Sequence, residues 1–203
     1  MGKIGINEAD NYNNNNGSYF SLKDNGDTAV VRFMYDTIDD VSLDVVHEVE
    51  VNGKQRNISC LRTYDEPIDN CPLCKAGFKQ KVKLFVPLYL DDKDEVQVWS
   101  RGKTFIQQLA SLCNRYKPLC STPFEIERQG KKGDQTTKYQ LYPHQTDGTT
   151  MDDLPELPDL STGIVMDKSF DELSYFVENG TFEGEQKKDS KQTTEVVKRR
   201  RAF

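Results

Sequence analysis

The sequence predicts a mainly β protein, and three observations support this fold class. Between residues 28 and 142, apolar and polar residues alternate in several segments, which is the period of a half-buried β-strand. An Asn-Gly dipeptide at 52–53 joins two of these segments and is a strong signal for a β-hairpin. Beyond residue 143 the alternation stops, and the rest of the 203-residue chain is polar. We therefore expect a β domain followed by a flexible tail.

The first predicted strands lie in the first third of the chain. Residues 28–35 are rich in strand-forming residues and follow the turn signal Asp-Asn-Gly at 24–26. Residues 43–51 alternate most clearly, with Asp and Glu on the face opposite the apolar one. Both positions of a type I′ turn need a positive φ, which Asn52-Gly53 tolerates. A return strand is therefore expected over residues 54–61.

Four more strands and one helix are predicted in the middle of the chain. Residues 79–90 and 96–101 both alternate and are separated by a charged turn. Residues 104–116 have helical spacing, and a proline follows them. Two strands over residues 124–128 and 138–142 are joined by a basic loop that contains two glycines.

The polar ends of the chain are expected to be flexible. Residues 11–17 are mostly asparagine and have too little apolar surface to offset the entropy of ordering. Residues 146–162 are rich in Asp, Thr and Pro, which is typical of a linker. We expect a flexible leader over residues 1–17, a folded domain over 18–145 and a largely disordered acidic tail with a basic end over 146–203.

One short helix is predicted within this tail. Ser169 and Glu172 have the spacing of a capping box, in which each side chain binds the backbone N–H of the other residue. Asn179-Gly180 favours a helix end, because glycine adopts the left-handed conformation without strain. The expected helix covers residues 170–177.

Charge is unevenly distributed along the chain. The net charge of -6 by itself argues against a nucleic-acid partner. However, residues 151–186 hold one Lys or Arg and ten Asp or Glu, whereas residues 187–203 hold seven and two. Residues 78–140 hold twelve cationic and seven acidic side chains, so this middle part has a charge suited to phosphate groups.

The location of the protein follows from what the sequence lacks. No apolar run approaches the roughly 18 residues of a membrane helix, and residues 1–10 lack the apolar stretch of a secretory signal. We expect a cytoplasmic protein with no membrane partner. In a reducing compartment the five cysteines are metal ligands or buried thiols rather than a disulfide framework. Cys113 and Cys120, beside apolar helix residues, are expected to be buried thiols.

Four residues form a candidate metal site. Cys71 and Cys74 have the two-residue spacing with which two thiolates bind one metal ion. The predicted hairpin pairs His47 with Ile58, and Cys60 shares the face of Ile58, so His47 and Cys60 are diagonal neighbours. We expect one structural Zn²⁺ per chain with these four ligands. The alternative is a buried core histidine, a buried Cys60 thiol and an accidental Cys-x-x-Cys.

The same residues do not match a catalytic zinc motif. Nucleobase deaminases need His-x-Glu and Pro-Cys-x-x-Cys, whereas Val49 stands two positions after His47, and Pro72 lies between the two cysteines. The chain also lacks a nucleophile elbow and a phosphate-binding glycine loop. The sequence therefore predicts a protein that is not an enzyme.

A basic and aromatic strand face is the candidate nucleic-acid surface. On the strand over residues 79–90, lysines and rings share one face, and the partner strand over 96–101 repeats this arrangement. Single-stranded nucleic acid binds such surfaces, because cations follow its phosphates and unstacked bases lie on aromatic rings. The predicted contact residues are Lys79, Lys81, Lys83, Phe85, Tyr89, Trp99 and Arg101, extended by Arg62, Tyr64 and Lys138.

The alternative for this face is a second layer of core. Phe85, Tyr89 and Trp99 would then be covered by the predicted helix, since large rings are often buried on whichever face they occupy. The three lysines favour the binding surface, because cations on alternate positions are unusual on a face covered by packing.

The metal-ligand pattern resembles that of a known family. Twelve residues separate His47 from Cys60, ten separate Cys60 from Cys71, and two separate Cys71 from Cys74. This pattern resembles the zinc-containing single-stranded DNA-binding proteins of tailed bacteriophages, and the resemblance covers about residues 18–143.

The resemblance implies a fold and a function. The fold would be a five-stranded OB-fold barrel with an inserted zinc-binding subdomain at about residues 47–78. The protein would coat and protect single-stranded DNA during phage DNA replication, recombination and repair, in the cytoplasm of the infected bacterial host. The acidic tail would recruit replication or recombination proteins, and no small-molecule substrate is expected.

Two other functions remain open from the residues alone. A zinc-ribbon regulator would bind duplex DNA or another protein, and a metal-dependent nuclease would cleave its substrate. Tight binding to oligo(dT) favours the first function, sequence preference on duplex DNA favours the regulator, and cleavage that needs a metal favours the nuclease.

Overall fold

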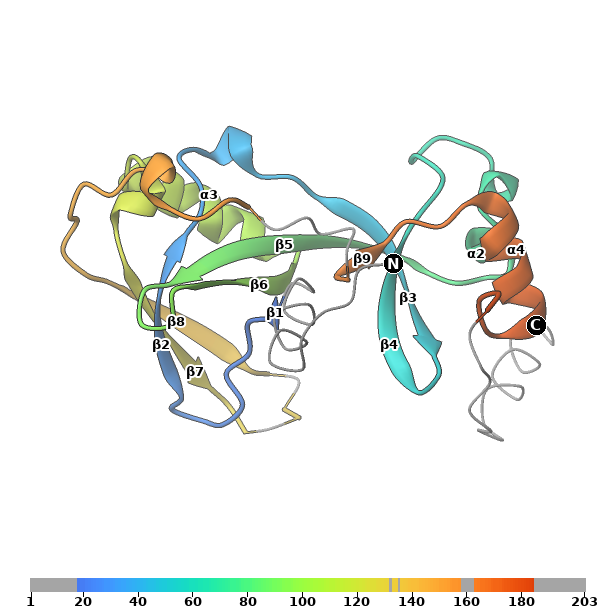
Figure 1. Cartoon of the computed structure of the whole chain (residues 1–203), viewed down its shortest axis with the longest axis horizontal. Coiled ribbons are helices and arrows are strands. Elements are labelled where there is room, and N and C mark those ends of the chain that lie inside the picture. Colours follow the sequence, from blue (N-terminus) through green and yellow to red (C-terminus); the bar gives the residue numbers. More distant parts are fainter. Residues whose placement is uncertain (1–17, 132, 135, 158–162, 185–203) are drawn as a thin grey trace, which may run out of the picture. The chain divides into compact units, whose positions relative to one another are not determined.

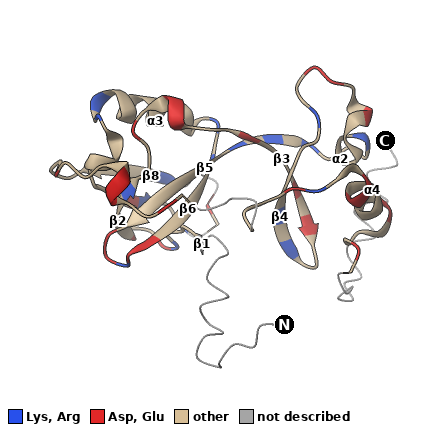
Figure 2. Ribbon diagram, turned by 45° about the horizontal axis from the view of Figure 1, so that its top comes forward, with Lys and Arg blue, Asp and Glu red and all other residues tan. Residues whose placement is uncertain are grey.

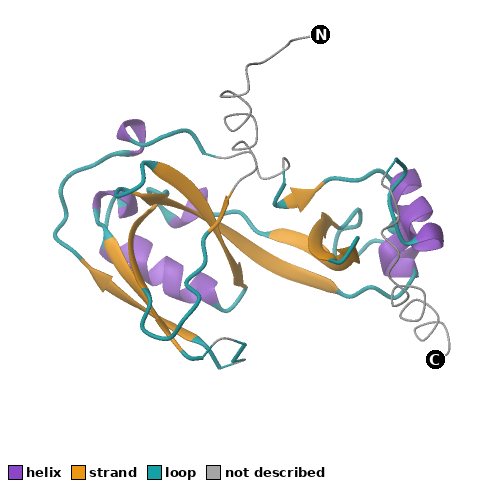
Figure 3. Ribbon diagram, turned by 60° about the horizontal axis from the view of Figure 1, so that its bottom comes forward, coloured by secondary structure: helices purple, strands orange, loops and turns teal. Residues whose placement is uncertain are grey.

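The computed structural model describes residues 18–131, 133–134, 136–157 and 163–184 of the chain. Its regular structure is mainly β, as predicted (Figure 3). The chain divides into two compact units, which are described separately below. Unit 1 comprises residues 1–43 and 83–160, and unit 2 comprises residues 44–82 and 161–203.

The described residues of unit 1 form a mostly antiparallel sheet and an α-helix of eleven residues, α3 (Phe105–Arg115). Its strands are β1 (Ser18–Tyr19), β2 (Thr28–Phe33), most of β5 (Gln80–Leu90), β6 (Glu95–Gly102), β7 (Phe124–Gln129) and β8 (Lys138–Pro143). Its connections contain the 3-10 helices η2 (Ile38–Asp40), η4 (Leu119–Ser121) and η5 (Met151–Asp153).

The strands of unit 1 form an open arrangement. They pair in the order β8-β7-β2-β5-β6, each pair antiparallel, and β1 pairs with β6 in parallel (Figure 1). The sheet of the described chain is therefore open and mixed, with β8 and β1 at its two edges in this unit. A closed five-stranded OB-fold barrel is not shown.

The core of unit 1 joins α3 to the strands. Phe105, Leu109 and Cys113 are buried and lie four positions apart on one side of the helix. They pack with strand residues that include Phe33, Val86 and Trp99. The helix predicted over residues 104–116 is confirmed.

The strand β5 differs from its predicted alternation. Leu84 to Leu88 are buried without interruption, including Phe85 at 3% exposure. A strand covered on both faces has a continuous apolar run rather than a period of two. Phe85 and Trp99, also 3% exposed, therefore belong to the interior in this structure, as in the alternative considered for this face.

Unit 2 contains the predicted hairpin. Its elements are β3 (Asp44–Val51), β4 (Lys54–Ser59), η3 (Ile68–Asn70), α2 (Pro72–Lys75), β9 (Val165–Met166) and α4 (Phe170–Asn179). Val51 pairs with Lys54 and His47 with Ile58, which is the predicted register. Asn52 and Gly53 have φ angles of 53° and 76°, as a type I′ turn requires.

The helix α4 is capped as the sequence predicts. The Ser169 side chain accepts from the backbone N–H of Glu172, and Gly180 ends the helix with a φ of 74°. Figure 1 shows α4 beside α2, and the buried Leu173, Phe176 and Phe182 pack in one cluster with residues of α2.

The described part of the acidic segment is ordered, unlike the flexible tail that we expected from residue 146. The strand β9 pairs in parallel with β4, and α4 completes the core of unit 2. In unit 1, Asp147 binds Arg32, and the Thr122 and Thr146 hydroxyls are 2.8 Å apart. Composition did not show this, because scattered apolar residues such as Leu173 are sufficient when a partner surface exists elsewhere in the chain. The leader over residues 1–17 and the basic end lie outside the described residues.

Candidate functional site

His47, Cys60, Cys71 and Cys74 come together in unit 2, and their ligand atoms all lie within 4.8 Å of one another. The His47 Nε2 atom lies 3.6 Å from the Cys71 sulfur and 3.5 Å from the Cys74 sulfur. The Cys60 and Cys74 sulfurs are 3.6 Å apart, and none of the three cysteines is in a disulfide.

These distances fit a tetrahedral metal site. With metal bonds of about 2.3 Å to sulfur and about 2.0 Å to nitrogen, neighbouring sulfurs lie about 3.8 Å apart, and sulfur and nitrogen lie about 3.5 Å apart. The three separations given above agree with those edges to within a few tenths of an ångström. The cluster could therefore hold one metal ion.

Local structure places each ligand. The hairpin holds His47 on β3, and the backbone N–H of Cys60 donates to the Val45 carbonyl just beyond the end of β4. Pro72 starts α2 without the loss of a backbone hydrogen bond, because the first N–H of a helix has no partner within that helix. The short helix turns Cys74 back toward Cys71.

The pKa values of Cys71 and Cys74 are shifted in opposite directions. Burial opposes ionisation of Cys71, but hydrogen bonding with His47 and backbone N–H groups lowers the pKa of Cys71 to about 6. Burial and the neighbouring Cys60 thiol raise the pKa of Cys74 to about 12. A bound dication would lower the pKa of both cysteines, because it favours the thiolate form of each cysteine that it contacts.

An outer layer of polar groups supports Cys60. The Gln80 side-chain amide N–H donates to the Cys60 sulfur at 3.0 Å, and Arg62 donates to the Gln80 side-chain oxygen Oε1 at 3.1 Å. Arg62 also donates to the Glu66 backbone carbonyl at 2.6 Å. The sequence reasoning assigned Arg62 to DNA and did not single out Gln80, which no motif marks.

The arrangement is suited to a structural role. Four protein ligands complete a tetrahedron and leave no position for water or substrate. His47, Cys71 and Cys74 are buried, and Cys60 is partly buried.

In unit 1 the buried Cys113 and Cys120 are free thiols. Burial raises the pKa of both, to about 12 for Cys120.

The three lysines predicted to contact DNA on the strand over residues 79–90 differ in their exposure and ion pairing. Lys79 is exposed and forms no ion pair among the described residues. Lys81 forms an ion pair with Glu48 on β3, and Lys83 is partly buried. Both signs of charge occur on the β3–β4 hairpin of unit 2 (Figure 2).

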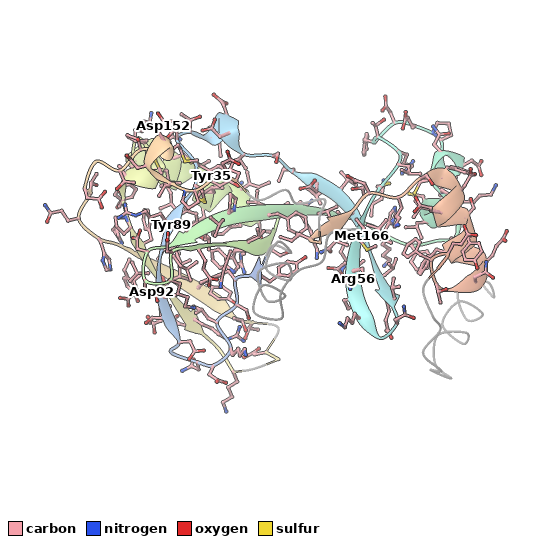
Figure 4. The ribbon with its side chains drawn as sticks, in the orientation of Figure 1. Tyr35, Arg56, Tyr89, Asp92, Asp152 and Met166 are labelled. Atoms are coloured by element: carbon pink, nitrogen blue, oxygen red, sulfur yellow. The ribbon has the colours of Figure 1, made fainter. Side chains whose placement is uncertain are left out.

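The predicted rings have very different exposures. Phe85 and Trp99 are 3% exposed, so neither can stack a base in this conformation, whereas Tyr64 is 97% exposed. The Tyr89 hydroxyl donates to Asp94 at 2.9 Å. Figure 4 labels Tyr89 and Asp92 at the end of the sheet where β5 turns into β6, and this acidic turn repels phosphate.

Arg101 lies among aromatic rings in unit 1. Its guanidinium carbon is 4.6 Å from the Trp99 ring centroid, 4.8 Å from that of Tyr139 and 5.3 Å from that of Phe105. Burial lowers the pKa of Arg101, and no carboxylate forms an ion pair with it among the described residues. Trp99 and Arg101 lie two positions apart on one strand, so the pattern of alternation predicts their shared face.

The surroundings of Arg101 include residues that sequence reasoning missed. The Tyr139 hydroxyl accepts from Arg128 at 3.0 Å, and the Arg128 guanidinium carbon lies 6.0 Å from the Tyr139 ring centroid. The alternation of Tyr139 with Leu141 on β8 was the available signal, since both pack against the core. Lys138, the predicted contact before Tyr139, is exposed.

No helix among the described residues combines the length and apolarity needed to cross a membrane. No protein-family model matches the sequence, and no curated protein matches it significantly.

Proposed function

We propose that this protein binds single-stranded DNA without catalysis and that one structural Zn²⁺ stabilises unit 2. On this proposal it coats and protects exposed strands during replication, recombination and repair of phage DNA in the host cytoplasm. The acidic residues beyond position 151 bind and recruit replication or recombination proteins.

The zinc assignment is supported by the donor set. Three thiolates and one imidazole are a common set for structural zinc, whereas hard metals such as Mg²⁺ and Ca²⁺ favour oxygen ligands. Unit 2 also needs such a support, because the loop between Cys60 and Cys71 exposes Tyr64 and Ile68 and adds little apolar core.

The observation that carries the DNA proposal is Arg101, a cation without an acidic partner that lies against the rings of Trp99 and Tyr139. Two exposed lysines are its neighbours in sequence or those of Tyr139: Lys103 lies two positions after Arg101, and Lys138 immediately precedes Tyr139 on β8. Among the described residues none of these three cations forms an ion pair. Uncompensated cations beside aromatic rings are the arrangement that single strands require.

Strand binding is tested by fluorescence anisotropy with a labelled oligo(dT). The full chain should bind it, and the affinity should fall steeply as salt rises, because bound cations release counterions from the strand. A combined Lys103→Ala and Lys138→Ala variant should bind all sequences more weakly and with a smaller salt slope. Lack of binding at low salt would show that the proposal is wrong.

The other two functions are separated in the same experiment. Unlabelled duplex DNA should compete poorly; strong, sequence-dependent competition would indicate a duplex-binding regulator. Cleavage of the labelled strand after addition of a divalent metal would indicate a nuclease.

Metal content is tested by elemental analysis of the purified protein. One zinc per chain is expected, and Cys71→Ser should remove it together with the protease resistance of unit 2. Unchanged zinc content in that variant would contradict the assignment of the ligands.

A further inference from the structure

Arg101 has an unusual environment for a charged side chain. It is partly buried at the end of β6, and three rings surround its guanidinium, those of Trp99, Phe105 and Tyr139. Aromatic faces attract a cation and hold a planar guanidinium in one orientation. The side chain is therefore positioned before any ligand arrives.

No group of the described chain satisfies the hydrogen-bonding capacity of Arg101. Its Nε atom is covered and has no hydrogen-bond partner. Two other arginines of unit 1 differ: Arg32 binds the carboxylates of Asp91 and Asp147, and Arg128 binds four oxygens of neighbouring residues and that of Tyr139. A guanidinium has five N–H donors, and the four on the two terminal nitrogens of Arg101 remain for an external anion.

Arg101 is partly accessible at the end of β6. The pairing of β1 with β6 ends with Tyr19 opposite Val98 and does not reach Arg101. Gly102 and Lys103, which follow Arg101, are exposed.

Trp99 does not stack a base in this arrangement. Its ring is 3% exposed, with Phe20 and Phe105 at ring-centroid distances of 5.8 Å and 5.2 Å. The Arg101 guanidinium lies over the ring of Trp99. A phosphate bound to Arg101 therefore changes the surroundings of Trp99 without stacking on its ring.

We propose that Arg101 binds a phosphate group of the strand and that Trp99 and Tyr139 are positioning residues that hold its guanidinium. The guanidinium presents two parallel N–H groups to two phosphate oxygens, which is the geometry that arginine favours. The identity of the ligand as a DNA strand rests on the proposed function, whereas the phosphate chemistry follows from Arg101 itself.

Trp99 is the one tryptophan of the chain, so its emission reports this site. The test uses the full chain with three ligands of equal length: oligo(dT), an abasic phosphodiester strand, and an uncharged peptide nucleic acid that carries thymine bases. Oligo(dT) and the abasic strand should change the emission of Trp99. The peptide nucleic acid should not change it, because it has no phosphate.

Variants separate Arg101 from general charge. Arg101→Gln should abolish the response to the abasic strand and reduce the salt slope of oligo(dT) binding by about one. Lys93→Gln removes an equally charged, exposed side chain on the β5–β6 turn and should behave as the wild type. Arg101→Lys keeps the charge without the planar fork and should give a weaker response.

Three results would overturn the inference. They are a response of Trp99 to the peptide nucleic acid equal to that to the abasic strand, a full response in Arg101→Gln, or oligo(dT) binding by anisotropy with no change in Trp99. Each leaves the proposed function intact. If Arg101→Gln does not fold, the comparison of the three ligands on the wild type decides the inference.

Failure of the proposed function has a different signature. If the chain binds no labelled strand, pyrophosphate is titrated against the wild type and Arg101→Gln. A Trp99 response that needs Arg101 would support the phosphate site without DNA, and no response in the wild type would overturn it.

Discussion

His47 has two ring nitrogens with different surroundings. Nε2 faces the sulfurs of Cys71 and Cys74, whereas the buried Nδ1 has no hydrogen-bond partner among the described residues. A ligating imidazole usually donates its second N–H to a neighbouring group, which raises its affinity for the metal. In this site the outer hydrogen bond instead reaches Cys60 from Gln80. Metal retention should therefore depend on Gln80.

We expect Gln80→Leu to release the metal about 10-fold faster or more, because outer hydrogen bonds typically change metal affinity by about 10- to 100-fold. The measurement is the rate of metal transfer to a coloured chelator. Gln55→Leu, on the exposed end of β4, is the matched control and should keep the wild-type rate. Equal rates in the two variants would show that Gln80 does not support the site.

Asp147 gives unit 1 a defined dependence on pH. The Arg32 side chain, followed by the backbone N–H of Thr149, holds the pKa of Asp147 well below its usual 3.8. The ionised carboxylate therefore stabilises the folded state fully above the usual carboxyl pKa, and this contribution is lost as the pH falls below it. Because the Asp147 side chain is 45% exposed, the contact is screened by solvent, and we expect Asp147→Asn to lower the free energy of unfolding by about 1 kcal/mol at pH 7.

The measurement for Asp147→Asn is urea unfolding between about pH 7 and pH 2.5. The difference from the wild type should shrink as the pH falls from about 5 toward 3. Asp152→Asn, an exposed neighbour on η5, should show no such trend. A difference that stays constant over this range would mean that the Arg32 contact does not depend on the charge of Asp147.

At the scale of elements, local signals in the sequence predicted what depends on neighbours along the chain. The Asn52-Gly53 turn fixed the register of β3 and β4, and this register brought His47 near Cys60. The capping box and Gly180 placed α4. Burial was less predictable: alternation put Phe85 on an open face, but contacts made far along the chain cover both faces of β5. The packing of α4 was unpredictable for the same reason, because its buried residues contact α2 and the metal-ligating cysteines, which lie far away in the sequence.

The helix α4 contributes to the stability of the metal site. Leu173 is fully buried in the cluster that contains Cys71 and Cys74. Leu173→Ala should destabilise unit 2 by about 2–5 kcal/mol, since it removes a buried side chain and leaves a cavity. Metal binding and folding of unit 2 are linked, so this variant should also lose metal to a chelator sooner.

Urea unfolding and chelator transfer measure the two effects of Leu173→Ala. Tyr175→Ala on the same helix is the control, because the Tyr175 side chain is 39% exposed and should cost little. Loss of stability without a change in metal transfer would show that α4 packs independently of the metal site.

At the scale of the whole molecule, neither unit is continuous in sequence. Unit 1 takes residues from before and after the metal-binding segment, and unit 2 takes residues 44–82 and 161–203. The metal ligands all lie in the first of these two segments, whereas Leu173, Phe176 and Phe182 come from the second. Unit 2 is therefore incomplete until the chain has been made as far as Phe182. The zinc subdomain was expected over residues 47–78 alone. Its apolar core also needs residues of the acidic segment, which we expected from composition to be a flexible tail.

Two truncations test this dependence. A chain that ends after Thr150 loses β9 and α4, and with them the apolar cover of Leu73 and the cysteines. It should bind zinc more weakly and be cut by protease within residues 44–82, although every metal ligand is present. A chain that ends after Gly184 keeps these elements and should retain the metal and the protease resistance of the full chain. The measurement is zinc content after dialysis against a chelator, together with the sites of limited proteolysis. Equal zinc retention in the two truncated chains would contradict the role of α4, because the shorter one has only its four ligands and the β3–β4 hairpin to hold the ion.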